Sequence, residues 1–315
     1  MSNTRRATIL IVVPPLAAAI ASIVALLALA PQLPDPLATH WGFDGKVNGT
    51  GSVASIIGIT ALFVPLLTAA VLVIFLLMAR GRTSSLFTRL MVATSVFVGT
   101  FVALTPLTFT IPQIDSADAG APVPWVLGAL LVAAVLATAM ALLVPKTAVV
   151  EGDATGAPAI SLVAGEKAYW SRTVAPHTAV IAIPIGAAVV ETVVLLAVGA
   201  PWWIALIIDL VIALAATTLV WRVVIDDRGL RARALLGLPR FAVPVSGAIG
   251  AQLVDIKPMA FGGWGVRLDA QGRWGVIIRG GEAIEIVRRD KAPFVITVDD
   301  AATGAALLNG LAQRS

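Results

Sequence analysis

Side chains able to recognise a ligand gather in one stretch near the N-terminus, residues 33–52. Prolines open this stretch, glycines close it, and polar and aromatic residues lie between them. Proline fixes φ and glycine permits positive φ, so this composition predicts a compact, specifically folded loop. Such a loop could bind a partner, or it could be only a lid with a local hydrogen bond at its histidine. The candidate recognition residues are Pro34, Pro36, His40, Trp41, Asp44, Gly45 and Asn48.

A metal site in this loop would have to use His40, Asp35 and Asp44. Metal sites need three or more ligands at fixed spacing. One histidine and two loop carboxylates are a weak candidate for such a ligand set. The chain has no cysteine and only one further histidine, His177. We therefore expect no metal, no cofactor and no disulfide.

Two acidic residues, Glu191 and Asp209, lie inside apolar runs that only residues 199–201 separate. Each acid is about seven residues from that connection, which is roughly 10 Å at 1.5 Å per helical residue. An antiparallel pair of helices therefore places both carboxyl groups at one depth. They could form a proton or cation site or an anchor for a peptide, or they could be a protonated pair that holds the hairpin together.

Basic and aromatic side chains form a third group in the C-terminal part. Arg231 and Arg233 alternate with apolar residues, and Trp264 lies in the glycine-rich stretch 262–265. Beside a membrane such residues would gain from contact with anionic lipid. Alternating arginines are also what the solvent face of an ordinary strand shows, so both interpretations stay open.

The elements that must position these residues are mostly apolar. Of all residues, 58% are hydrophobic and 13% are charged, whereas soluble domains carry about 25% charged residues. The sequence therefore predicts a six-helix transmembrane bundle. The six apolar runs cover about residues 7–30, 55–78, 90–111, 125–144, 178–198 and 202–221.

The basic residues indicate how these helices are oriented. They gather on one side of the predicted membrane, in the segments 5–6, 80–89 and 146–172, while the opposite side carries only Lys46. The positive-inside rule then places both termini in the cytoplasm and the loop 31–54 outside. We do not interpret the net charge of +4 as affinity for nucleic acid.

After residue 221, short apolar runs alternate with turn signals, which is typical of antiparallel β structure. Asp299 or Asp300 can cap a final helix over residues 301–312. The predicted fold class is thus membrane α plus β. The predicted parts are a two-helix unit with its extracellular loop (1–80), the third and fourth helices (81–144), a cytoplasmic linker (145–177), a helical hairpin (178–221) and a cytoplasmic β domain (222–315).

The loop residues resemble a known family. Pro34, Pro36, His40, Trp41 and Gly45, directly after a first apolar run, are similar to a domain of unknown function that recurs in bacterial membrane proteins. Its best-known members are immunity proteins against the sporulation-delaying toxin. The chain departs from the family pattern where Asn48 replaces an acid and Thr50 replaces an aromatic residue. The resemblance implies a bacterial inner-membrane protein that binds an extracellular peptide or an envelope protein.

The C-terminal part resembles a second family. About seven strands followed by one helix, over residues 221–315, are similar to a pleckstrin-homology-like (PH-like) domain. This resemblance implies that the cytoplasmic part binds anionic lipid or a cytoplasmic protein.

Motifs of common enzymes are missing from the sequence. It contains no phosphate-binding loop of the Gly-x-x-x-x-Gly-Lys-Ser/Thr type, no His-Glu-x-x-His and no Gly-x-Ser-x-Gly. We therefore expect a non-enzymatic membrane protein. Its external loop would recognise or protect against an envelope factor. The alternative is a proton- or cation-coupled transporter that uses Glu191 and Asp209, and a third possibility is a structural scaffold.

Overall fold

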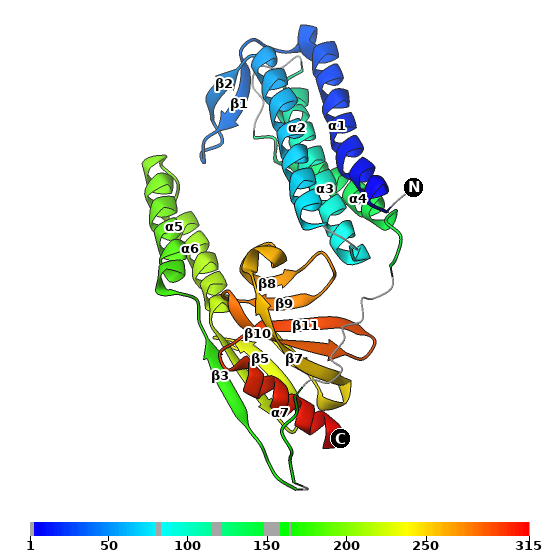
Figure 1. Ribbon diagram of the computed structural model, residues 1–315. Helices are drawn as coiled ribbons and strands as arrows, with labels where there is room; N and C mark the ends of the chain where they lie inside the picture. The colour runs from blue at the N-terminus through cyan, green and yellow to red at the C-terminus, as the bar shows by residue number, and fades with distance from the viewer. Residues whose placement is uncertain (1–2, 80–82, 115–120, 148–157, 164, 315) are drawn as a thin grey trace. The chain divides into compact units, whose positions relative to one another are not determined.

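The computed structural model describes residues 3–79, 83–114, 121–147, 158–163 and 165–314. These residues form two compact units, Met1–Thr147 and Ala148–Ser315 (Figure 1). Six helices in the described ranges are long and apolar enough to cross a membrane, which confirms the six predicted runs. Arg80 and Arg82, on which the predicted orientation partly depends, lie outside the described residues.

The first unit is a bundle of four helices with a two-stranded sheet at one end. Serine side chains begin two of the helices, because Ser52 and Ser84 each accept a hydrogen bond from the backbone N–H three residues on, at 3.2 Å. The elements are α1 (Asn3–Leu29), η1 (Ala30–Gln32), β1 (Leu37–Trp41), β2 (Val47–Gly51), α2 (Val53–Met78), α3 (Ser85–Thr110), η2 (Ile111–Gln113) and α4 (Val123–Leu142).

Helices α1 and α3 pack closely where α1 contains two prolines. Pro15 has no backbone N–H, so the carbonyl oxygen of Ile11 loses its helical donor. The Ser95 hydroxyl of α3 donates a hydrogen bond of 2.8 Å to that oxygen. Gly99 makes room one turn further on, since a Cβ there would lie 2.4 Å from the Cβ of Pro15. The helix therefore continues through its prolines with α3 as its partner.

The second unit combines two sheets, a helical hairpin and a final helix. It begins with β3 (Trp170–Val174), followed by α5 (Thr178–Ala197), α6 (Trp202–Ala216) and η3 (Thr217–Leu219). The strands that follow are β4 (Trp221–Asp226), β5 (Gly229–Ala234), β6 (Arg240–Val243), β7 (Ala248–Ile256), β8 (Gly265–Leu268), β9 (Trp274–Ile277), β10 (Gly281–Arg288) and β11 (Lys291–Thr297). Helix α7 (Ala301–Arg314) closes the chain, as predicted.

The two sheets have the orders β3-β4-β5-β6 and β7-β10-β11-β9-β8. A shared apolar core includes Trp221, Ile284 and Leu308. All neighbouring strands are antiparallel except β9 and β11, which are parallel, so the prediction of purely antiparallel structure is wrong at that pair. Strand β11 inserts between β9 and β10, and it runs antiparallel to β10 and parallel to β9. The likeness to a PH-like domain stays a prediction.

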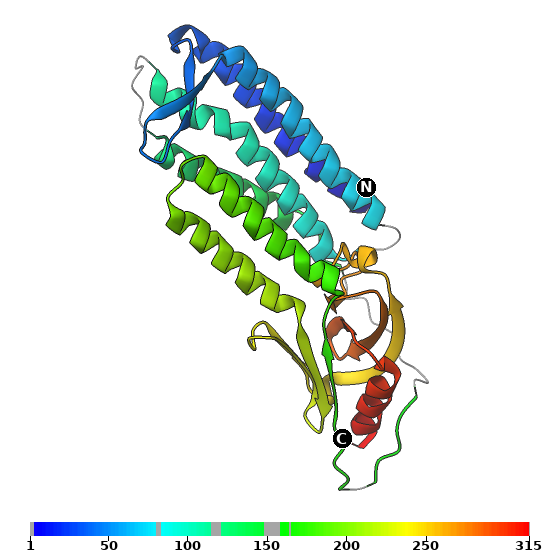
Figure 2. The ribbon, with the colours of Figure 1, turned by 90° about the vertical axis from the view of Figure 1, so that its left-hand side faces the viewer.

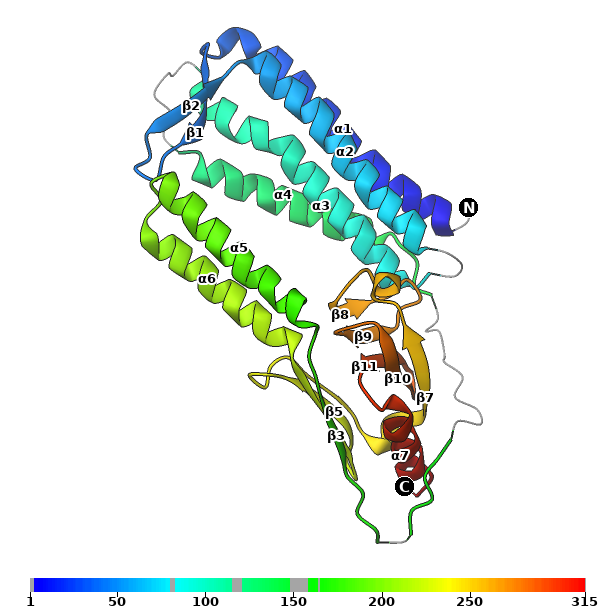
Figure 3. The ribbon, with the colours of Figure 1, turned by 60° about the vertical axis from the view of Figure 1, so that its left-hand side comes forward.

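Strand β3 lies in the segment 145–177, which the sequence analysis treated as a linker. It pairs with β4, with Trp170 opposite Ile225 and Val174 opposite Trp221. The helical hairpin α5–α6 therefore connects two adjacent strands of one sheet (Figure 3). Gly199, at φ +74, ends α5 in the left-handed conformation that glycine adopts readily.

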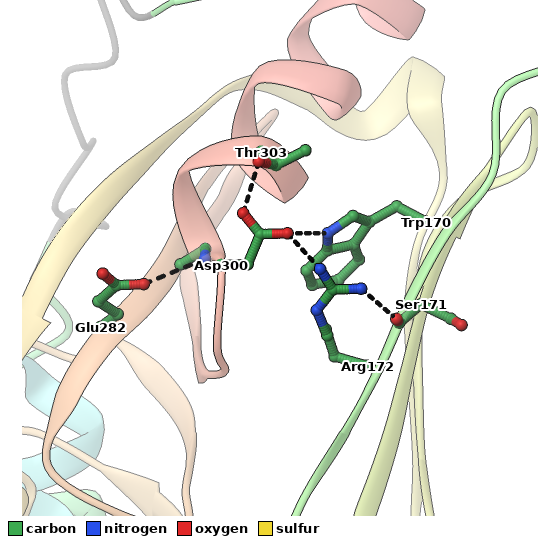
Figure 4. Close-up of polar contacts among 7 residues, drawn as sticks. Trp170, Ser171, Arg172, Glu282, Asp300 and Thr303 are labelled. Atoms are coloured by element: carbon green, nitrogen blue, oxygen red, sulfur yellow. Dashed lines mark hydrogen bonds and ion pairs between the residues drawn. The ribbon is translucent and has the colours of Figure 1, made fainter.

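Asp300 joins β3 to the start of α7 (Figure 4). Its carboxylate accepts hydrogen bonds from the Trp170 indole N–H at 3.1 Å and from the Arg172 guanidinium at 2.5 Å. It also accepts one from the Thr303 hydroxyl, in the first turn of α7, at 2.5 Å. The Arg172 guanidinium lies over the Trp170 ring, 5.4 Å from its centroid. The missed strand is thus fixed to the sheet domain at a specific charged site.

Candidate functional site

The predicted loop is a β-hairpin made by β1 and β2 (Figure 2). Its turn is closed by hydrogen bonds from Gly42 N–H to the Lys46 carbonyl at 2.8 Å and from Gly45 N–H to the Gly42 carbonyl at 2.9 Å. Gly45 has φ +78, and the Asp44 carboxylate accepts the Lys46 N–H at 3.1 Å. Two of the predicted recognition residues, Asp44 and Gly45, therefore also build the turn.

His40 is exposed on β1 and lies opposite Gly49. A Cβ on Gly49 would come within 3.0 Å of the Cβ of His40, so a glycine at that position leaves space for the imidazole. The Nδ1 atom of His40 is 3.3 Å from the hydroxyl of its neighbour Thr39. The ring is thus held against the hairpin and open to solvent.

The base of the hairpin is buried among the ends of three helices. Leu37 is fully buried in an apolar cluster with Leu26 of α1 and Ile56 of α2, and Leu107 of α3 packs against it. A buried apolar base packs the strands against the bundle. The hairpin is therefore held by side-chain contacts as well as by the chain segments that join it to α1 and α2.

Gln113 holds the hairpin at a second point, which the sequence analysis missed. The Ala38 N–H donates to Oε1 of Gln113 at 2.8 Å, and Nε2 of Gln113 donates to the Ala38 carbonyl at 2.9 Å. The same Nε2 donates to the Phe109 carbonyl at 2.6 Å. The side-chain amide therefore pairs with β1 much as a neighbouring strand would. Its only signal in the sequence is a lone amide at the end of an apolar run.

The tip of the hairpin presents apolar and polar side chains to solvent. Phe43 is 60% exposed and Val47 is 43% exposed. Asp44 and Asn48 are exposed beside them, and Trp41 is half-buried. Pro34 and Pro36 lie before β1, half-buried and exposed respectively. An exposed aromatic tip on a fixed base is suited to binding a peptide or protein surface.

The two acidic residues of the helical hairpin are brought together. Asp209 accepts a hydrogen bond of 3.0 Å from the hydroxyl of Thr192, the residue after Glu191. Glu191 and Asp209 are near enough to interact electrostatically. Both oxygens of Glu191 and the second oxygen of Asp209 are covered and have no hydrogen-bond partner in the described residues. The antiparallel register that the sequence predicts therefore places the pair at one level.

Trp264, Arg231 and Arg233 are not brought together. Trp264 precedes β8 in the five-stranded sheet and is 46% exposed. The two arginines lie on β5 in the four-stranded sheet, where Arg231 forms an ion pair with Asp226. The three predicted lipid-facing residues thus belong to two separate surfaces of the second unit.

Comparison with known proteins gives one match. A family model described as a domain of unknown function (DUF1648) matches residues 17–69, which cover the later part of α1, the hairpin and the earlier part of α2. This match confirms the N-terminal domain of unknown function that the loop residues predict. No curated protein and no solved structure matches the chain. In the described part of the chain, no three His, Asp or Glu side chains are grouped so as to hold a metal ion.

Proposed function

We propose that this chain is a non-enzymatic multi-pass protein of a bacterial plasma membrane whose β1–β2 hairpin recognises, or protects against, a factor in the cell envelope. The observation that carries the proposal is the hairpin itself, with its buried base, its Gln113 contact and its exposed tip around Phe43. A recognition surface gains affinity when it is ordered before its partner arrives.

The proposed orientation places both termini in the cytoplasm and the hairpin outside. It is supported by the basic residues Arg5, Arg6 and Arg89 and by the segment 146–172, which fall on one side of the spans. In this orientation the second unit presents its sheets to the cytoplasm, where they bind lipid or a cytoplasmic protein and report the state of the hairpin.

The immunity-like or sensor-like part of the proposal rests on the resemblance of the loop residues to toxin-immunity proteins, because the matched domain is described only as one of unknown function. The match is centred on the hairpin and includes every predicted recognition residue. Asn48 and Thr50 depart from the pattern of the toxin-immunity proteins that this region resembles. We therefore propose recognition of a peptide or protein other than that toxin.

Photo-crosslinking in living cells tests this function. A photoreactive phenylalanine analogue at Phe43 captures a defined peptide or protein, and His40→Ala removes the captured band. The same analogue at Trp264, in the second unit, serves as the matched control and does not capture that partner. Capture of lipid alone, or of nothing, at Phe43 overturns the proposal.

A transporter is the second candidate, because three carboxylate oxygens of Glu191 and Asp209 are covered and have no hydrogen-bond partner among the described residues. Such acids within apolar helices commonly mark proton or ion pathways. Proton flux into liposomes separates the two functions. Flux that Glu191→Gln and Asp209→Asn abolish, and that His40→Ala leaves intact, favours the transporter. Absence of flux together with capture at Phe43 favours recognition.

A further inference from the structure

The outer face of the four-stranded sheet carries a pocket of about 500 Å³. Its lining includes Tyr169 and Thr173 beside β4 and three arginines from the neighbouring strands β4 and β5. Those three arginines are Arg222, Arg231 and Arg233. The pocket is thus a basic hollow on a surface that points away from the apolar core.

Strand register places arginines directly opposite one another. Arg222 of β4 pairs with Arg233 of β5, and Arg233 pairs with Arg240 of β6. Opposite positions have Cβ atoms about 5 Å apart, and like charges there destabilise a sheet. A row of three arginines across three strands is therefore a cost to folding that an anion between them would relieve.

The protein itself supplies little negative charge to this face. In the part of the chain that the structure describes, Arg222, Arg233 and Arg240 form no ion pair. Arg231 pairs with Asp226, yet its Nε–H is covered and has no hydrogen-bond acceptor in the ranges that the structure describes. The pocket therefore combines uncompensated charge with a buried donor that lacks an acceptor.

The same pocket lies beside the end of the membrane-crossing hairpin. Arg222 is the second residue of β4, which follows α6 and η3, and Thr173 is the last but one residue of β3, which precedes α5. The Leu235 N–H at the end of β5 donates to the Thr217 carbonyl of η3 at 3.4 Å. The pocket is therefore close to the level at which α5 and α6 leave the bilayer.

An apolar loop borders the pocket on that side. Leu235, Leu236 and Leu238, which follow β5, are 64%, 64% and 68% exposed. Leu235 also lines the pocket. Exposed leucines next to arginines match the two layers of a membrane interface, where acyl chains lie beside phosphates.

We propose that this pocket binds the phosphate-bearing headgroup of an anionic membrane lipid, with Arg222 and Arg233 as the main donors and the leucine loop in the acyl layer. Guanidinium groups bind phosphate in a two-pronged geometry that a lysine does not reproduce. The inference deepens the proposed lipid- or protein-binding role of the second unit and rests on it. The leucines favour a lipid over a soluble phosphate compound.

The test measures binding to the purified full-length chain in a neutral detergent. The probes are short-chain phosphatidylglycerol, short-chain phosphatidylcholine and inorganic phosphate. We expect saturable binding of phosphatidylglycerol, at least tenfold weaker binding of the other two, and a loss of at least tenfold in the Arg222→Gln/Arg233→Gln variant. The matched control Arg228→Gln/Arg289→Gln removes the same charge from exposed sites elsewhere and leaves the affinity unchanged.

Two further variants keep the result decisive. Arg222→Lys/Arg233→Lys retains the charge, so it folds as the wild type does and loses part of the affinity through the missing two-pronged contact. Leu236→Ser/Leu238→Ser weakens binding of phosphatidylglycerol and leaves that of inorganic phosphate unchanged. Equal binding of inorganic phosphate and phosphatidylglycerol overturns the lipid as the source, and equal losses in the control variant overturn the site. This assay measures lipid binding to purified protein, whereas crosslinking at Phe43 measures recognition by the hairpin in cells. A negative result in one is therefore distinguishable from a negative result in the other.

Discussion

Gln113 provides one of the two contacts that place the hairpin on the bundle, beside the buried apolar base. Replacing it by alanine leaves the N–H and carbonyl of Ala38 buried and unpaired. We expect Gln113→Ala to cost about 2 kcal/mol, because orphaned buried groups lose their full desolvation energy. Hydrogen exchange of the β1 amides checks this and should be accelerated. Gln32→Ala, an exposed glutamine in η1, is the control. Unchanged exchange in Gln113→Ala would show that the apolar base alone holds the hairpin.

Asp300 gives the sheet domain a dependence on pH. The Thr303 hydroxyl, the Trp170 indole and the Arg172 guanidinium hold the pKa of Asp300 below its usual value. The pKa of an aspartate in the unfolded chain is about 3.9. The stabilisation that these contacts give is therefore fully present above that pH, and it is lost as the pH falls through the lower pKa of the folded state. We expect Asp300→Asn to lower the thermal midpoint at pH 7, and the gap to wild type to shrink at lower pH. Asp227→Asn, an exposed acid, should show no such gap.

The sequence indicated most of the residues at the candidate sites but not how each is used. Asp44 and Gly45 were predicted for recognition, and the structure gives both a part in the turn. Glu191 and Asp209 were placed at one level because helical rise is regular. Gln113 was missed because a contact across 75 positions leaves no local pattern.

Among the elements, the α1–α3 contact depends on a single missing side chain. A Cβ at Gly99 would overlap Pro15, whereas nothing lies within 4 Å of one built at Gly128 in α4. We expect Gly99→Ala to destabilise the first unit by about 1–3 kcal/mol through overpacking, and Gly128→Ala to be neutral or slightly stabilising. Thermal unfolding in detergent compares the two. Equal thermal midpoints for the two variants would mean that α1 and α3 move apart to accommodate the new Cβ without a loss of stability.

The arginine row predicts a gain of stability when it is interrupted. Arg233 faces like charges on both sides, so Arg233→Gln should stabilise the lipid-free protein by about 0.2–1 kcal/mol. Adding phosphatidylglycerol should then raise the midpoint of the wild type more than that of the variant. Thermal unfolding with and without the lipid measures both. A lower thermal midpoint for the lipid-free variant would show that Arg233 stabilises the sheet, contrary to this prediction.

At the scale of the whole molecule, the sequence predicted local periodicity well and long-range pairing poorly. The six apolar helices follow from run length, and the strands from β4 to β11 follow from alternation, although they number eight where about seven were predicted. Strand β3 was missed because its partner lies beyond two helices, and the parallel β9–β11 pair was missed because it depends on where β11 inserts. The presence and type of elements show in a sequence, whereas their exact bounds and the choice of neighbours depend on packing.

The proposed orientation can be tested on a chain that has no cysteine of its own. A thiol introduced by Asn48→Cys should react with a membrane-impermeant maleimide in intact cells. One introduced by Arg228→Cys should react only after the membrane is opened. Both sites are exposed, so burial does not explain a difference. The reverse pattern would invert the proposed topology.

The position of α5 and α6 between β3 and β4 has a consequence for biosynthesis. The ribosome completes β3 before it synthesises either helix. The strand therefore has no β4 to pair with while both helices are inserted. Strand β4 reaches the side on which β3 lies only after both helices have crossed the membrane. An unpaired edge strand is a site of aggregation and degradation. Because β3 and β4 are paired neighbours in one sheet, that sheet can close only in chains whose α5–α6 hairpin returns to the side on which β3 lies.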